Sequence, residues 1–395
     1  MKKLLFLGGS YSQVPAIKRA VELGYYVITA DYLPNNPGHV FSNEYYNVST
    51  TDKKAILELA IKLSIDGIIA YASDPGAPVA AYVSTKLKLP TSPLESIEIL
   101  GEKHLWRKFL NDNGFNVPMS QSGVLLSDFN LDKLKFPIMV KPVDSSGSKG
   151  VTKVNVSDEF LDAFVYAQEY SRNKIIIAEE FVEKIGCQIG GDGFYGIDRL
   201  EFVCFGDQFV DKGVNPFVPA GMLFPSAIDR HLQEKISAEI ERALQCLKVT
   251  NLSFNLEVML DKEENIYLME IGPRNGGNFI PQVIEYLTNV SLVDLALKSA
   301  VKEDIVINSE IKEEGYYGYY AVHSDKEGHL QDVKYIFPNS IELLKEYRFI
   351  ANGLEVQKFN GSNCTIGILI LRFENRKVMD LFYIESDSFI KVNVK

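Results

Sequence analysis

Two glutamates inside apolar segments are the residues of this chain best suited to do chemistry. Glu257 lies in Ser253–Leu260 and Glu270 in Ile266–Ile271, two predicted strands that the polar turn Asp261–Asn265 joins. A carboxylate among apolar residues is costly unless it is paired or binds a metal. A hairpin would bring the two carboxylates together, where they could hold Mg²⁺. The alternative is that each glutamate pairs with Lys or Arg for purely structural reasons.

A loop of small residues could bind phosphate. Pro137–Val140 predicts a buried strand, Lys141 ends it, and the loop Asp144–Gly150 (DSSGSKG) follows. Small residues let the backbone approach a ligand, so that successive N–H groups form an anion-binding nest. Lys149 adds a point charge for phosphate oxygens. A flexible surface hairpin is the alternative. The GxxxxGK[ST] spacing is absent, and a strand over 151–156, not a helix, is predicted to follow.

Two cations complete the set. Arg274 follows the second glutamate, in Gly272–Asn278, and its planar guanidinium matches a carboxylate or a phosphate bidentately. Lys212, in a predicted strand Gln208–Val214, could reach a γ-phosphate, although a surface lysine is an equal alternative. The chain has no GxSxG motif and no Cys–His spacing that would activate a nucleophile. Loop, carboxylates and Arg274 together therefore predict a magnesium–nucleotide site for phosphoryl transfer.

Over residues 1–300 these motifs, in this order, resemble the ATP-grasp superfamily, in its branch of carboxylate–amine ligases, carbamoyl-phosphate-synthase-like enzymes and carboxylases. The resemblance implies ATP and Mg²⁺ (or Mn²⁺) as cofactors. It places two lysines on the phosphates, the small-residue loop over the β- and γ-phosphates, a hinge whose backbone binds adenine, and a glutamine at the ribose. The implied nucleotide residues are Lys103 and Lys141, then Ser145, Ser146, Gly147, Ser148, Lys149 and Gly150, then Glu179, Glu180, Phe181 and Val182, and finally Gln188.

The resemblance also implies that Glu257 and Glu270 hold the metal. Gly272 stands where many members carry a third, asparagine ligand, so Asn275 or water would complete the shell. Arg274 and Lys212 are the implied catalytic cations.

The first hundred residues alternate strands and helices, which predicts a doubly wound parallel sheet. Ligands of such sheets bind beyond the carboxyl ends of the strands, so an acceptor substrate is expected there, with local capping as the alternative role of the acids. The glycines lack the GxGxxG register of a dinucleotide site. The candidate substrate residues are Gly9, Ser10, Asp31, Asp74 and, from the later loop, Asn278.

The predicted fold class is a multidomain combination of α/β and α+β parts. An N-terminal α/β domain (1–93) and a helical linker (94–117) precede the small (118–183) and large (184–309) ATP-grasp lobes, the large lobe carrying the metal site. A small strand-rich α+β unit (310–395) follows. Within these parts the pattern predicts strands 200–205 and 208–214 joined by a Gly206–Asp207 turn, and helices over 340–347 and 375–384.

Composition limits the partners. A net charge of −11 argues against nucleic acid and against an anionic membrane, and no run approaches the ~20 apolar residues of a membrane span. Four cysteines without CxxC spacing predict reduced, buried thiols in a cytoplasmic protein. The resemblance adds homodimers, which many members form.

The preferred function is an ADP-forming ligase that activates a small-molecule carboxylate as an acylphosphate and joins it to an amine. Two alternatives stay open. One is an ATP- and bicarbonate-dependent carboxylase of the aminoimidazole-ribonucleotide or biotin carboxylase type, and the other is an inactive ATP-binding protein.

Overall fold

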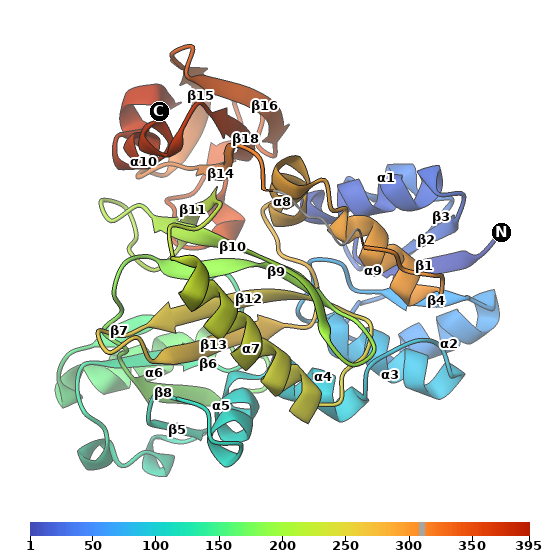
Figure 1. Ribbon diagram of the computed structural model, residues 1–395, viewed down its shortest axis with the longest axis horizontal. Coiled ribbons are helices and arrows are strands. Elements are labelled where there is room, and N and C mark those ends of the chain that lie inside the picture. Colours follow the sequence, from blue (N-terminus) through green and yellow to red (C-terminus); the bar gives the residue numbers. More distant parts are fainter. Residues whose placement is uncertain (308–312) are drawn as a thin grey trace.

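The N-terminal part of the chain forms the predicted parallel α/β layer. The structure, a computed structural model, describes residues 1–307 and 313–395 (Figure 1). The parallel sheet has the order β3-β2-β1-β4, and Leu4–Leu7 is buried because helices cover the sheet. The short strand β3 is an addition to the predicted pattern. The elements are β1 (Lys3–Leu7), α1 (Val14–Glu22), β2 (Tyr26–Ala30), β3 (Glu44–Tyr46), α2 (Lys53–Leu63), β4 (Gly67–Ile69) and α3 (Ala77–Leu87).

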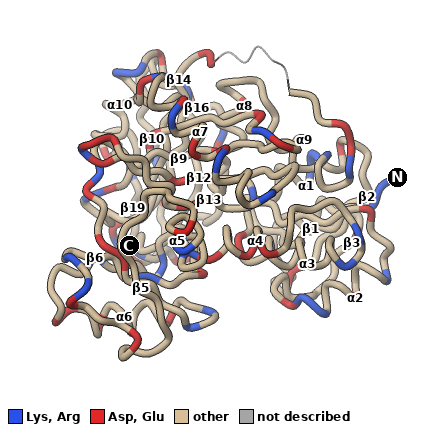
Figure 2. Tube along the Cα trace, turned by 60° about the horizontal axis from the view of Figure 1, so that its bottom comes forward, with Lys and Arg blue, Asp and Glu red and all other residues tan. Residues whose placement is uncertain are grey.

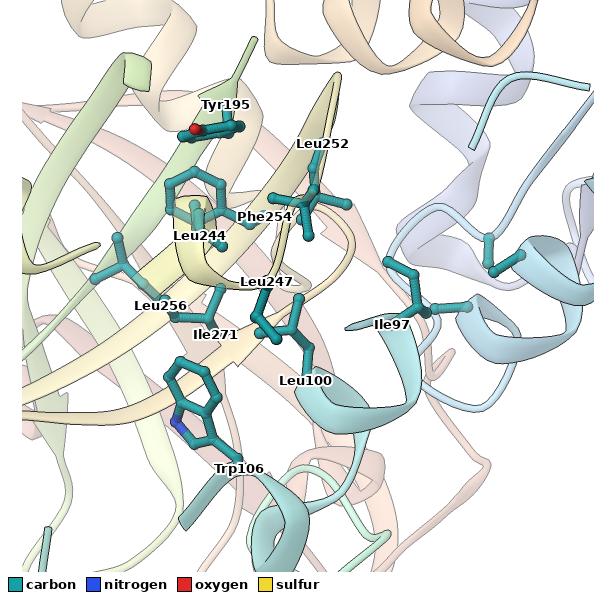
Figure 3. Packing of buried hydrophobic residues seen from close by; sticks show 14 of the residues in the cluster. Ile97, Leu100, Trp106, Tyr195, Leu244, Leu247, Leu252, Phe254, Leu256 and Ile271 are labelled. Carbon is teal, nitrogen blue, oxygen red and sulfur yellow. The ribbon is translucent and has the colours of Figure 1, made fainter. Parts of the chain in front are cut away.

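Two short helices, α4 (Leu94–Gly101) and α5 (Lys103–Asp112), connect this layer to the two lobes that follow. Figure 3 shows side chains of α4 and α5 among those of the neighbouring strands and of α7 (Arg230–Cys246). Trp106 is 1% exposed, and its indole Nε1 donates to the carbonyl oxygen of Leu268 at 2.9 Å. This packing fixes α5, and with it Lys103, relative to the strand that carries Glu270.

The small lobe is an antiparallel sheet of order β5-β8-β6-β7, covered by α6. Strands β6 and β7 pair in the register Ile138↔Val154, so the small-residue loop closes a hairpin between them. The elements are β5 (Ser120–Gly123), β6 (Ile138–Pro142), β7 (Thr152–Val154), α6 (Phe160–Tyr170) and β8 (Ile176–Glu180).

The large lobe contributes five strands to one long sheet of order β13-β12-β9-β10-β11-β14-β18-β16. Helix α7 lies across it, and α8 and α9 run back toward the N-terminal layer (Figure 1). The elements are β9 (Gln188–Tyr195), β10 (Leu200–Val210), β11 (Pro219–Phe224), β12 (Leu252–Leu260), β13 (Ile266–Gly272), α8 (Ile280–Thr288) and α9 (Leu292–Ala300).

The predicted turn at Gly206–Asp207 is wrong, because β10 runs unbroken through it. Gly206 and Asp207 pair with Gly190 and Ile189 of β9. The Asp207 carboxylate is buried and accepts from Ser226 and, at 2.7 Å, from Arg376 Nη2. Long-range partners thus satisfy a residue pair whose local preference is for a turn.

The C-terminal strands continue the large sheet. Strand β14 pairs with β11 in the register Met222↔Tyr319, and β18 and β16 follow at the edge. A second sheet of order β17-β15-β19 packs beside them, with α10 and α11. The elements are β14 (Tyr316–Val322), β15 (Gly328–Tyr335), β16 (Ile341–Arg348), β17 (Glu355–Val356), β18 (Gly367–Phe373), α10 (Arg376–Ile384), α11 (Ser386–Phe389) and β19 (Ile390–Val394).

One predicted C-terminal helix is confirmed and the other is wrong. Helix α10 matches the prediction over 375–384, whereas 340–347 forms strand β16. The Leu, Glu and Lys residues of β16 favour a helix, but pairing with β18 makes this segment a strand. The predicted boundary between 309 and 310 lies outside the described residues.

Charged residues are spread over much of the described chain (Figure 2). Figure 2 shows acidic and basic positions interspersed along the trace. No helix in the part of the chain that the structure describes is long and apolar enough to cross a membrane. Of the four cysteines, which form no disulfide, Cys204 and Cys364 are buried as expected, but Cys187 and Cys246 are exposed, contrary to the expectation of buried thiols.

Candidate functional site

Glu257 and Glu270 lie directly opposite each other on β12 and β13, as the hairpin predicted. Gln188 Nε2 donates to Glu257 Oε2 at 2.7 Å. Burial, followed by the negative charge of Glu270, raises the pKa of Glu257 to about 7, against the effect of Lys103 and Lys141. Two facing carboxylates whose charges oppose each other form a site that a divalent cation would stabilise.

This pair does not surround a metal by itself. Among residues 1–307 and 313–395, no group of three or more His, Cys, Asp or Glu side chains comes together to hold an ion. The chemistry of two hard oxygen ligands nevertheless fits Mg²⁺, which keeps several waters and takes further oxygens from substrate phosphates.

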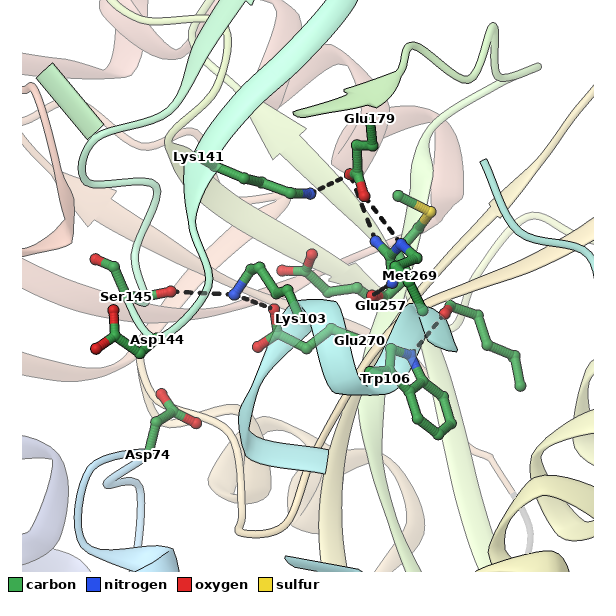
Figure 4. Close-up of polar contacts among 12 residues, drawn as sticks. Asp74, Lys103, Trp106, Lys141, Asp144, Ser145, Glu179, Glu257, Met269 and Glu270 are labelled. Atoms are coloured by element: carbon green, nitrogen blue, oxygen red, sulfur yellow. Dashed lines mark hydrogen bonds and ion pairs between the residues drawn. The ribbon is translucent and has the colours of Figure 1, made fainter. Parts of the chain in front are cut away.

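Lys103, at the start of α5, links the carboxylates to the small-residue loop. Its Nζ lies 3.0 Å from Glu270 Oε2 and donates to the carbonyl oxygen of Ser145 at 3.1 Å (Figure 4). Burial works against the charged form, but Glu270, with Asp74 and Glu257, outweighs burial and raises the pKa of Lys103. A lysine that stays charged therefore lies between the Glu270 carboxylate and the loop.

A second buried cluster joins Lys141 to Glu179 and Arg107. The Lys141 ammonium contacts Glu179 Oε1, and Arg107 Nε donates to Glu179 Oε2 at 2.9 Å (Figure 4). Glu179 is 1% exposed, and although burial disfavours its charge, Arg107 and Lys141 lower its pKa to about 2. Burial lowers the pKa of Lys141, against the pull of Glu179. The Glu179 side chain therefore serves an ion-pair network at this point of β8.

The small-residue loop has the backbone of a tight ligand-binding turn. Gly147, Ser148 and Gly150 have φ values of 67°, 59° and 73°, in the left-handed region. Ser148 Oγ donates to the carbonyl oxygen of Phe217 at 2.6 Å, so the loop contacts the segment before β11. Ser145, Ser146 and Lys149 complete it at partly buried positions.

The predicted hinge lies at the end of β8. The N–H groups of Glu180 and Phe181 donate to the carbonyl oxygens of Met119 (2.9 Å) and Pro137 (3.0 Å). Val182 follows immediately and is half-buried. Gln188, the predicted ribose residue, begins β9 beyond the hinge and uses its amide on Glu257.

Arg274 is held by Asp74 of the N-terminal layer. Nε and Nη2 of Arg274 donate to the two carboxylate oxygens of Asp74, each at 2.7 Å, and Nη1 donates to the Asn275 carbonyl at 3.1 Å. Burial opposes the charge of Asp74, but Arg274 outweighs it and lowers the Asp74 pKa. Two residues that the sequence suggested separately thus form one bidentate pair between domains.

Asn275 faces a carboxyl group that the motifs did not suggest. Asn275 is 1% exposed, and its Nδ2 donates to Asp192 at 3.3 Å. Asp192, fully buried on β9, also accepts from Gly276 N (2.7 Å) and Asn255 Nδ2 (2.9 Å). Burial raises the pKa of Asp192 to about 7. The amide of Asn275, on the glycine-rich loop after β13, is therefore hydrogen-bonded to Asp192 of β9.

The remaining predicted residues have other contacts. Lys212 is exposed on the turn after β10. Asp31 accepts from Gly9 N, Leu33 N and Asn36 Nδ2, contacts that organise its own loop, as the capping alternative expects. Ser10 is exposed, and the Asn278 amide lies 3.4 Å from the hydroxyl of Tyr319 on β14.

A cavity of about 420 Å³ borders Arg274 and Asn275. Its walls come from the edge strand β4, helices α3 and α9, and the start of β12, including Ser253. It touches none of Gly9, Ser10 and Asp31 among the described residues. The cavity is mainly apolar with scattered hydroxyl groups.

Arg107 and Asp192 are the site residues that the motifs did not identify. Arg107 stands four positions after Lys103, so both fall on the same side of α5. That spacing, beside the buried Trp106, is the signal that could have revealed it. Asp192 lies in a strand of glycines and apolar residues, and a lone acid there is the corresponding signal.

Comparison with known proteins finds a family model, curated relatives and solved structures that this chain resembles. The family model for the C-terminus of D-ala D-ala ligase matches residues 123–289. The carbamoyl phosphate synthase large chain of Thermoanaerobacter sp. strain X514 is 24% identical over 238 residues, which are 59% of this chain and 21% of that relative. The chain thus spans about a fifth of the length of this curated relative.

Solved structures share the whole fold. An L-amino acid ligase from Bacillus licheniformis superposes with a TM-score of 0.85 at 21% identity, over 100% of this chain and 99% of the other. The biotin carboxylase domain of Hydrogenobacter thermophilus 2-oxoglutarate carboxylase, solved with MgADP and bicarbonate, gives 0.75 at 15% identity, over 100% and 91%.

The family match over residues 123–289 and the fold shared with these structures support the ATP-grasp superfamily. The predicted superfamily and the predicted fold class are confirmed.

Proposed function

We propose that the protein is an ATP-dependent, ADP-forming ligase that activates a small-molecule carboxylate as an acylphosphate and joins it to an amine. The observation that carries the proposal is the line Glu257–Glu270–Lys103–Ser145, in which two facing carboxylates, a charged lysine and the small-residue loop follow one another. Charge neutralisation gathered at one end of a nucleotide suits transfer of a γ-phosphoryl group.

The nucleotide would lie between the two lobes. Because the N–H groups of Glu180 and Phe181 are already used, we assign adenine to the Val182 N–H. Lys103 and the loop Ser145–Gly150 would hold the phosphates, with Lys141 oriented by Glu179. Mg²⁺ held by Glu257 and Glu270 would neutralise phosphate charge. The MgADP bound by a relative of the same fold supports these cofactors.

The acid would approach from the N-terminal side. Asp74 occupies one edge of the Arg274 guanidinium, so the remaining N–H groups of Nη1 and Nη2 are the ones that could meet a carboxylate or the transferring phosphate. The cavity beside Arg274 and Asn275 is the space we assign to a substrate. We expect small-molecule substrates and a cytoplasmic protein with free cysteines.

The experiment is a screen for ADP release over a panel of carboxylates and amines, followed by product analysis. We expect ADP and inorganic phosphate in equal amounts, and ¹⁸O from a labelled carboxylate in that phosphate. AMP and pyrophosphate as the stoichiometric products would contradict the mechanism. ADP release that requires bicarbonate and an amine, but no other acid, would instead identify a carboxylase.

A further inference from the structure

The small-residue loop touches the C-terminal unit. A side chain added at Gly147 would collide with Ser362 Oγ, and one added at Gly361 would stand 3.2 Å from Lys149 Cγ. Gly361 and Ser362 belong to the segment Phe359–Cys364, which we call the clamp loop. It follows β17 and precedes β18, more than two hundred residues from Gly147 along the chain. The apex of the small-residue loop therefore rests on a distant part of the protein.

The clamp loop is firmly anchored at both ends. Phe359 is fully buried, and it packs with Val218, Ala220 and Cys364 in a small separate core. Its N–H donates to the carbonyl oxygen of Ser324 at 3.0 Å, and Cys364 N–H donates to the Gly361 carbonyl at 3.0 Å. The ends of the clamp loop thus lie in an apolar core, while its polar residue Ser362 faces Gly147.

The same base holds the other contact of the small-residue loop. Ser148 donates to the carbonyl oxygen of Phe217, which directly precedes Val218 of that core. His323 connects the clamp loop to the segment between β10 and β11, which contains both Asp211 and Phe217. Its ring stacks on Phe359 with 4.2 Å between ring centroids, and its Nε2 lies 3.1 Å from Asp211 Oδ2. The small-residue loop is therefore contacted on two sides by segments that share one anchor.

We propose that the clamp loop sets the closed position of the small-residue loop, with Ser362 as a positioning residue that acts through Gly147. Through this contact the C-terminal unit takes part in catalysis. The inference rests on the proposed function for what the loop covers, a nucleotide triphosphate. A shift of about 1 Å in a group that positions a reacting phosphate can cost on the order of 10²-fold in rate.

The first test inserts a wedge. Ser362 is half-buried and Ser388, on α11 of the same unit, is exposed, so Ser362→Leu and Ser388→Leu form a matched pair. We expect Ser362→Leu to lower kcat for ADP formation on the order of 10²-fold and to leave the Kd of adenosine within about twofold, because adenosine has no phosphate for the loop to hold and the adenine hinge is untouched. Ser388→Leu should match the wild type. Equal turnover in Ser362→Leu and the wild type overturns the proposal.

A second readout needs no turnover. Lys149 lies in the small-residue loop, and trypsin cuts after lysine only where the backbone is free to open. We expect faster tryptic cleavage after Lys149 in Ser362→Leu, and to a smaller degree in Ser362→Ala, than in the wild type or Ser388→Leu. Unchanged cleavage in both Ser362 variants overturns the clamp contact, even if the protein proves to have a different activity. Faster cleavage without any ADP formation by the wild type would refute the proposed function only.

A rescue separates contact from backbone strain. Gly147 and Gly353 both have left-handed φ, 67° and 87°, but no atom lies near a side chain added at Gly353. We expect Gly147→Ala to reduce kcat far more than Gly353→Ala, and Ser362→Gly to restore part of the activity of Gly147→Ala by removing the colliding hydroxyl. Absence of any rescue would show that strain at Gly147 alone explains the loss.

Discussion

Two buried carboxylates about the same nucleotide site have opposite surroundings. Glu179 meets two cations, Lys141 and Arg107, and its pKa falls to about 2. Glu257 meets a neutral amide, Gln188, and faces another carboxylate, and its pKa rises to about 7. Protein cations pair with the first carboxylate, while the second receives a hydrogen bond from Gln188 and faces Glu270, a position that a divalent cation would stabilise. Burial alone therefore does not separate a structural acid from a ligand-binding one, whereas the count of its charged neighbours does.

The largest effect expected from this difference concerns stability. Glu179→Gln leaves Lys141 and Arg107 buried without a counter-charge, so we expect the free energy of unfolding to fall by about 3–5 kcal/mol. Glu257→Gln, the matched change at the other carboxylate, should leave stability unchanged or raise it, since it removes a charge that opposes Glu270. Urea denaturation of the metal-free proteins measures both. Equal losses in the two variants would remove the distinction.

Mg²⁺-dependent activity should fall in Glu257→Gln, the variant whose stability is expected to be unchanged. Glu257→Gln removes a hard anionic ligand, and we expect Mg²⁺-dependent ADP formation to fall at least ~100-fold. Titration of activity with Mg²⁺ measures the change. Glu270→Gln should lose as much activity, but it also deprives Lys103 of its 3.0 Å partner and should therefore be less stable than Glu257→Gln. Normal activity of Glu257→Gln at low Mg²⁺ would make Glu257 a structural residue.

The two carboxylates should also respond oppositely to pH. Glu257 has a raised pKa, so its contribution to stability is complete below its ordinary value near 4.5 and is lost as pH rises through about 7. Glu179 has a lowered pKa, so its contribution is complete above about 4.5 and is lost as pH falls toward 2. Urea midpoints of wild type and Glu257→Gln in chelator measure the first effect. Their difference should widen as pH rises to about 8, and Asp192, with its own pKa near 7, cancels because both proteins contain it.

The smallest expected effect is at the hydrogen bond that Glu257 does receive. Gln188→Ala removes a 2.7 Å donor to a partly charged acceptor, a loss of about 1 kcal/mol. We expect the pKa of Glu257 to rise further and the Mg²⁺ concentration for half-maximal activity to increase by less than about tenfold. Gln121→Ala, at a partly buried glutamine of β5 whose amide group is bonded to the Asn130 backbone, is the control. A loss of activity as large as that of Glu257→Gln would assign Gln188 a direct role at substrate.

The sequence predicted the parts of this site that depend on short stretches of chain. Apolar runs located β12 and β13, and the polar turn between them placed both glutamates on one hairpin. Glycines and serines located the loop at Gly147 because few residues accept its left-handed backbone.

The contacts between distant segments could not be predicted in the same way. Arg107 with Glu179, Arg274 with Asp74, and Asn275 with Asp192 are each set by how separate elements pack. The error at β16 has the same origin, because helix-forming residues there yield to the strand pairing that β18 offers. Local preference thus identified candidates, and tertiary packing decided which of them meet.

The continuous pairing of β11 with β14 has a consequence for any attempt to shorten the chain. A protein truncated before Tyr316 would expose the β11 edge from Gly221 to Phe224, with its backbone donors and acceptors unpaired. Met222 and Phe224 would also lose apolar cover, since their core includes Tyr317 and Tyr319. Such an edge is a template for adding strands from other molecules, so a chain that ends after its small and large lobes should aggregate.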